Sequence, residues 1–212
     1  MLKHIYKILL IILLLDLGYS FYQHYHMPLG GDMAGIIKPT PTKGYYQVLN
    51  DPIGLDVLLN KKIHFNPNRF FAHWSASTYF LNIPILLQKA VEPIDSIYLS
   101  CAIVKIIVQI LIIYLLATYI SNTGNIFKPD FLIAATLITP LFQTSGYCRY
   151  LGIIDQSVIY TFFYAFSLGL LLLFFLPFFK AIYYGKKPIF NLVINILLAL
   201  FIIVLSFNGP LV

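Results

Sequence analysis

Runs of about 20 apolar residues recur along this chain of 212 residues and limit its fold more than any other feature. A helix of that length matches the roughly 30 Å hydrocarbon thickness of a bilayer. A soluble protein of this size has no interior in which such helices could be buried on every side. We therefore expect an all-α integral membrane protein, a single transmembrane domain with about five transmembrane helices at residues 5–22, 96–120, 131–145, 157–178 and 189–207.

The composition agrees with this expectation. Hydrophobic residues make up 59% of the sequence and charged residues 10%, against roughly 45–50% and about 25% in soluble domains. The net charge of +6 does not indicate a nucleic-acid partner, because the basic residues mostly flank the apolar runs, as topology-determining residues do. Cys101 and Cys148 lack the spacing of a disulfide framework or of a zinc site.

The charges around the runs predict the orientation. Lys3 and Lys7 accompany the start of the first run without an acid, which indicates a cytoplasmic N-terminus. A cleaved signal peptide is the alternative, and we disfavour it because no small-x-small cleavage site follows the run. With five crossings, six of the eight acids fall on the outer side: Asp32, Asp51, Asp56, Glu92, Asp95 and Asp155.

A long outer loop, residues 23–95, follows the first run. Its stretches "GLDVLLNKKIHF" and "RFFAHWSASTYFLNIPILLQKAV" mix aromatic and apolar residues and are broken by Pro84 and Pro93. They predict short amphipathic helices on the membrane surface. Arg69 and His73 are i, i+4 neighbours on one helix face that could meet a lipid phosphate, although the pattern alone favours an interfacial anchor.

Two acids of this loop are candidates for chemistry. Asp32 follows Gly30–Gly31, and glycines allow a substrate or metal to approach the backbone closely. The alternative is a turn in which Asp32 caps a short helix beginning at Met33. Asp51 belongs to "DPIG", which is typical of an ordinary turn or helix start.

Ionisable groups also lie within or beside the apolar runs. Asp16 and Lys105 are expected at similar depths in the first two helices, which predicts an ion pair between them, completed by Gln109. A proton or ion relay is the alternative. His24 and His26 are spaced i, i+2 and therefore face different sides of a helix, which favours an interfacial position over metal binding.

The second outer loop holds Arg149 and Asp155 on either side of "YLGII". They could pair with each other or reach the same cavity as Asp32. The sequence contains no nucleotide-binding glycine loop, no Gly-x-Ser-x-Gly and no His-Glu-x-x-His, so soluble-enzyme chemistry has no support.

The order of these parts resembles the N-terminal half of the membrane glycosyltransferases of the GT-C class. The resemblance lies in "GGDMAG" after the first helix, in "NPNRFFAHW" followed by "YFLNIPILLQ", and in "TPLFQTSGYCRYLGIIDQ" before the fourth helix. The class generally has more than five spans. Because the chain ends at "LSFNGPLV" without a polar tail, we expect the front part of a longer protein; a C-terminus on the outer face is the alternative.

The resemblance implies a bacterial inner-membrane enzyme that transfers a sugar from a polyprenyl-phosphate donor. It implies an acid of the first outer loop as base or metal ligand, and so leaves a divalent metal open as cofactor. The catalytic candidates are Asp32, Asp155 and Asp51, and the substrate-binding candidates are Arg69, His73 and Arg149. The alternative is a non-catalytic polytopic protein, either an assembly or binding subunit or a transporter fragment.

Overall fold

The computed structural model describes residues 2–42, 44–64, 69–142 and 153–208. The described residues form helices and connections, with no strand among them, so the all-α prediction is confirmed for this part of the chain. The longer helices are α1 (Leu2–Tyr25), α5 (Phe70–Leu87), α6 (Pro93–Ser121), α7 (Pro129–Ile138), α9 (Ser167–Tyr183) and α10 (Leu192–Ser206). The short ones are α2 (Met33–Ile37), α3 (Gly44–Asn50), α4 (Leu55–Asn60) and α8 (Val158–Tyr160).

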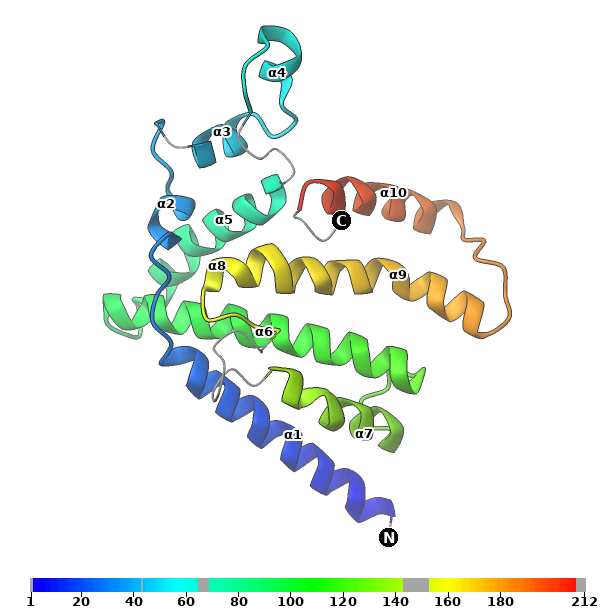
Figure 1. The fold of residues 1–212 in the computed structure, drawn as a ribbon. Helices are drawn as coiled ribbons and strands as arrows, with labels where there is room; N and C mark the ends of the chain where they lie inside the picture. Colours follow the sequence, from blue (N-terminus) through cyan, green and yellow to red (C-terminus); the bar gives the residue numbers. More distant parts are fainter. Residues whose placement is uncertain (1, 43, 65–68, 143–152, 209–212) are drawn as a thin grey trace.

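Helix α6 is the centre of the structure, with α1, α5, α7 and α9 packed around it (Figure 1). Pro93 begins the helix, where its missing N–H costs nothing. Side chains buried along its length include Val104, Val108, Ile112 and Ala117. On the α9 side, a Cβ atom at Gly169 would lie 3.1 Å from a methyl carbon of Leu111, so this glycine allows the two helices to approach closely.

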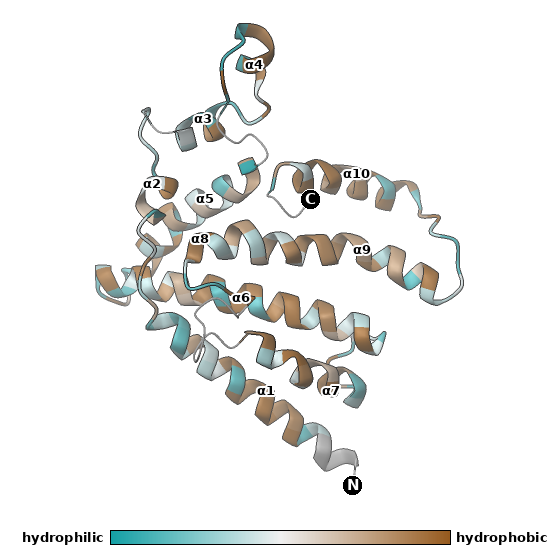
Figure 2. Ribbon diagram, viewed as in Figure 1, coloured by the Kyte–Doolittle hydropathy of each residue, from teal (hydrophilic) through white to brown (hydrophobic). Residues whose placement is uncertain are grey.

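Three helices of the described residues are long and apolar enough to cross a membrane: Tyr6–Tyr25, Pro93–Ser121 and Val158–Tyr183. The third comprises α8, a π-helical segment at Thr161–Phe166 and α9. Two shorter apolar helices lie at Pro129–Phe142 and Leu192–Ser206. Figure 2 shows hydrophobic residues along these helices and hydrophilic ones in connections such as that between α9 and α10.

Helix α7 is short because its α-helical hydrogen bonding stops before Pro140. The α-helix ends at Ile138, and a 3-10 turn continues it over Thr139–Phe142. A proline inside an α-helix removes one backbone hydrogen bond and clashes with the preceding turn. The third apolar run, expected as a helix at residues 131–145, is therefore interrupted within its length.

The stretch "GLDVLLNKKIHF" forms the short helix α4, as expected, whereas helix α5 corrects the expectation of a short surface helix in the second stretch. It runs for 18 residues through Pro84 and packs against α2, α3 and α6. The reason is a buried stripe of mainly small residues, at helical spacing, that outweighs the hydrogen bond lost at Pro84: Ala72, His73, Ala76, Ser77, Phe80 and Pro84. Two hydroxyl groups fix the helix, because Ser77 donates to the Ile37 carbonyl at 2.6 Å and Tyr79 donates to the Ser100 carbonyl at 2.9 Å.

Candidate functional site

Two loops that are distant in sequence meet where α1 ends and where α6 and α8 begin (Figure 1). The first loop, residues 26–32, follows α1, and the second, residues 153–157, precedes α8. A Cβ atom at Gly30 would lie 2.9 Å from Ser157 Oγ and 3.6 Å from Ser157 Cβ. The absence of a side chain at Gly30 therefore allows the loops to touch.

Each of these loops carries one of the predicted acids. Asp32 is exposed and occupies the N-cap position of α2, yet its side chain makes no capping hydrogen bond. Asp155 is half-buried, and its Oδ1 accepts a hydrogen bond of 2.7 Å from the backbone N–H of Ser157. Asp32 Oδ1 and Ser157 Oγ lie 3.4 and 2.9 Å from the same point above Gly30, so they are within about 6 Å of each other. The structure therefore brings Asp32 to the loop that bears Asp155.

A cavity of about 190 Å³ lies between the loops, lined by Pro28, Leu29, Gly30, Asp155, Gln156, Ser157 and Tyr160. The hydroxyl oxygen of Ser157 is buried and has no hydrogen-bond partner among the described residues. Buried polar atoms in proteins nearly always have a partner. The cavity is thus lined by one carboxylate, that of Asp155, with the unpartnered Ser157 hydroxyl buried in its wall. Asp32 lies beside the cavity and is not one of its lining residues.

Lys105 of α6 lies beneath both loops, with 1% of its surface exposed. Its ammonium group donates to the carbonyl oxygen of Gln156 at 2.6 Å and to the sulfur of Met27 at 3.3 Å. Within the described part of the chain it makes no ion pair with Asp16, so the predicted Asp16–Lys105 pair is wrong. Helical side chains point toward the N-terminus of their own helix, which directs Lys105 to the loops above the start of α6.

Gln109 also differs from its expected role beside Lys105. Its carbonyl oxygen lies 3.0 Å from His24 Nε2, and its amide nitrogen donates to Ser20 Oγ at 3.1 Å. His24 is buried between α1 and α6, whereas His26 is exposed and lies 2.8 Å from the Tyr22 carbonyl. The two histidines do face different sides, but His24 belongs to the core and not to an interface.

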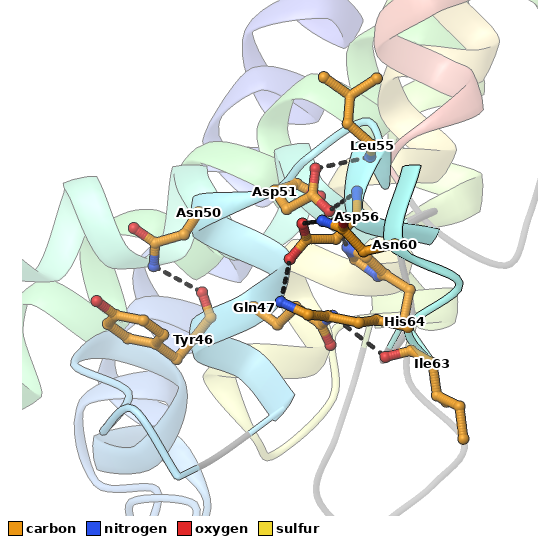
Figure 3. Close-up of polar contacts among 10 residues, drawn as sticks. Tyr46, Gln47, Asn50, Asp51, Leu55, Asp56, Asn60, Ile63 and His64 are labelled. Atoms are coloured by element: carbon orange, nitrogen blue, oxygen red, sulfur yellow. Dashed lines mark hydrogen bonds and ion pairs between the residues drawn. The ribbon is translucent and has the colours of Figure 1, made fainter. Parts of the chain in front are cut away.

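Asp51 lies in a different part of the structure, at the start of α4 (Figure 3). Its two carboxylate oxygens accept hydrogen bonds from the backbone N–H groups of Leu55 at 2.8 Å and Asp56 at 3.0 Å. His64 Nε2 lies 2.7 Å from the Asp51 carbonyl oxygen. The carboxylate therefore caps a helix, as the helix-start interpretation predicts, and does not line the cavity.

Arg69 and His73 contact one aromatic ring. The Arg69 guanidinium carbon lies 5.4 Å from the ring centre of Phe163, and the His73 ring lies 4.8 Å from it. His73 is fully buried, with Tyr45 at 5.2 Å on another side. Burial and, to a smaller extent, the nearby charge of Arg69 together lower the pKa of His73 to about 4. Neither residue lines the cavity, and Arg149 lies outside the described residues.

Sequence reasoning missed Ser157, Gln156 and Met27 as parts of the site. Met27 follows the first apolar run, and Ser157 lies just after Asp155 of the second outer loop. No pattern in the sequence indicates that these two residues, 130 positions apart, belong to one site. The described residues contain no group of three His, Cys, Asp or Glu side chains that could hold a metal ion. Asp32 and Asp155 therefore do not by themselves make a metal centre.

No family model matches the sequence, and neither the curated proteins nor the solved structures include one that is significantly similar to it.

Proposed function

We propose that this protein is a membrane glycosyltransferase of the GT-C type. It transfers a sugar from a polyprenyl-phosphate donor to an acceptor hydroxyl in the cavity between residues 26–32 and 153–157. One observation carries the proposal: two acid-bearing loops, each next to the end of an apolar helix, touch and border an open cavity of about 190 Å³.

The membrane location is part of the proposal. Three helices have the length and hydropathy of membrane spans, and α10 leaves most of its apolar side chains exposed. So much exposed apolar surface is unfavourable in water and natural in lipid. We place the N-terminus in the cytoplasm of a bacterial cell and count α7 and α10 as the third and fifth crossings, which puts both loops on the outer face.

Asp32 is the better candidate for the base. Its carboxylate is exposed and makes no capping bond, whereas one oxygen of Asp155 already holds the Ser157 N–H. Asp32 takes the proton of the acceptor hydroxyl as its oxygen forms a bond to the anomeric carbon of the sugar. The bond from that carbon to the phosphate oxygen breaks, and polyprenyl phosphate leaves with the electron pair. Asp155 and Ser157 orient the acceptor.

The test is sugar transfer by the purified full-length gene product with a polyprenyl-phosphate sugar as donor. Asp32→Asn keeps the shape of the side chain but removes the base, so we expect transfer to fall at least about 100-fold. Asp56→Asn is the matched control, because Asp56 is an acid of the same long loop whose partners are Asn60 and Lys62. Full activity in Asp32→Asn would refute the role of Asp32, and no transfer by the wild type would favour the non-catalytic alternative.

A further inference from the structure

Lys105 joins three segments of the chain that are otherwise far apart in sequence. It belongs to α6, and its ammonium group contacts Met27 of the first loop and the Gln156 carbonyl of the second. Both acceptors are uncharged. Lys105 makes no direct ion pair within the part of the chain that the structure describes, although the charge of Asp155 in the second loop attracts it at longer range. Direct pairing with a carboxylate, the usual explanation for a buried lysine, therefore does not apply.

A buried ammonium group is costly, and an apolar side chain of similar volume would generally be tolerated at such a position. What an apolar side chain cannot do is donate hydrogen bonds. An ammonium group has three N–H donors in one place, and here two of them are directed at two different loops. We propose that Lys105 is a positioning residue that ties the two loops together and so sets the spacing of Asp32 and Asp155.

An effect of Lys105 on catalysis rests on the proposed function, but its role in holding the two loops together does not. Gly30 lines a small cavity together with Lys105 and Gln156, and Ser157 follows Gln156. The separation of Gly30 and Ser157 can be measured without an activity assay. A Cβ atom at Gly30 would lie 3.6 Å from Ser157 Cβ, within the range of about 3.5–4.5 Å that a disulfide requires. The pair Gly30→Cys/Ser157→Cys, with Cys101 and Cys148 replaced by Ser, therefore reports contact between the loops.

The experiment compares the rate of oxidative cross-linking of this pair with Lys105 present and with Lys105→Met. Methionine keeps the length of the side chain but has no donor, so we expect cross-linking to slow at least tenfold. Lys105→Arg restores donors and should recover the rate to within about threefold of Lys105. Lys89→Met removes an exposed lysine and should leave the rate unchanged.

A second cysteine pair separates a local effect from general unfolding. Asn208 Nδ2 donates to Ser167 Oγ at 2.7 Å, in contacts that do not involve Lys105. A short bifunctional thiol reagent should therefore cross-link Ser167→Cys/Asn208→Cys at the same rate with Lys105 and with Lys105→Met. Unchanged cross-linking of the Gly30–Ser157 pair in Lys105→Met would overturn the proposal. Slower cross-linking of both pairs would also overturn it, because Lys105 would then support helix packing in general.

Activity provides the remaining test. If the tie positions the two acids, Lys105→Met should lower kcat at least tenfold with a smaller change in KM, and Lys105→Arg should recover part of the loss. Equal kcat values in Lys105 and Lys105→Met would overturn the positioning role. If the wild type transfers no sugar, the proposed function fails, whereas the cross-linking result still decides whether Lys105 joins the loops.

Discussion

His73 is an unusual residue because it is fully buried and neither ring nitrogen has a hydrogen-bond partner in the described structure. Its neighbours are the rings of Tyr45 and Phe163. An imidazolium in this position would lack both water and a carboxylate, and Arg69 would repel it. The side chain is therefore neutral in the folded protein well below the ordinary pKa of histidine.

This burial makes stability depend on pH in a definite direction. In the unfolded chain His73 binds a proton below about pH 6.5, whereas in the folded chain it does so only below about pH 4. Between these values the unfolded state binds more protons than the folded state. The stability that depends on neutral His73 is therefore complete above pH 6.5 and is lost as the pH falls toward 4. The loss amounts to at most roughly 3 kcal/mol.

Thermal unfolding in detergent between pH 5 and 7.5 measures this effect. We expect His73→Phe to flatten the fall in melting temperature at low pH, because phenylalanine fits the aromatic surroundings and does not titrate. His26→Phe is the control, since His26 is exposed and should leave the profile as it is. Identical profiles for His73→Phe and the wild type would show that His73 is not the titrating group.

The residues of the site show what a sequence can predict at this scale. The sequence predicted Asp32 and Asp155 as candidate site residues and Lys105 as a charged residue that needs a partner. An acid after two glycines and a charge within an apolar run are both uncommon. Similar depths along two helices predicted the pairing of Lys105 with Asp16. Depth does not fix direction, and the side chain of Lys105 points along α6 to Met27 and Gln156.

Among the elements, α4 depends on a cap that comes from outside the helix. Asp51 accepts hydrogen bonds from the Leu55 and Asp56 N–H groups, which the first turn of an α-helix leaves without internal partners. Asp51→Ala should therefore weaken α4 by about 1 kcal/mol. Amide hydrogen exchange at these two residues should accelerate about fivefold, while α6 is unaffected.

Sugar transfer should be unchanged in Asp51→Ala, because its carboxylate lies apart from the cavity. Asp51→Asn keeps one oxygen acceptor and should show an intermediate exchange rate. Loss of transfer in Asp51→Ala with an intact fold would return Asp51 to the catalytic candidates.

The elements themselves were predicted unevenly. The long apolar helices were expected, because a continuous run of about 20 apolar residues can form few structures other than a membrane-spanning helix. Helix α5 was expected to be short, since Pro84 interrupts its sequence. Its 18 residues hold together through packing on α6, and tertiary contacts of this kind cannot be read from local sequence.

At the scale of the whole molecule, the contact between the two loops constrains the path of the chain. Gly30 follows α1, and Ser157 precedes α8, yet they touch. Between them α6 carries the chain away from this end, so the chain has to return before α8 begins. Helix α7 is the apolar helix available for that return among the described residues. At about 15 Å for its ten residues, plus a 3-10 turn, it is short for a bilayer of roughly 30 Å.

Single cysteines in a background without Cys101 and Cys148 test this path. If α6, α7 and α8–α9 all cross, Ile63→Cys in the loop after α4 should react with a membrane-impermeant maleimide only from the outer side. Asn125→Cys between α6 and α7, and Lys186→Cys after α9, should react only from the cytoplasmic side. All three positions are exposed, so a lack of reaction reports the membrane and not burial.

Right-side-out and inverted vesicles give the two directions of access. Reaction of Asn125→Cys and Lys186→Cys from opposite sides would mean that α7 does not cross. The contact between Gly30 and Ser157 would then be incompatible with a bilayer, because α6 would separate the two loops by the full thickness of the membrane. The labelling pattern therefore tests the membrane topology and the two-loop site together, since the site requires both loops on one face.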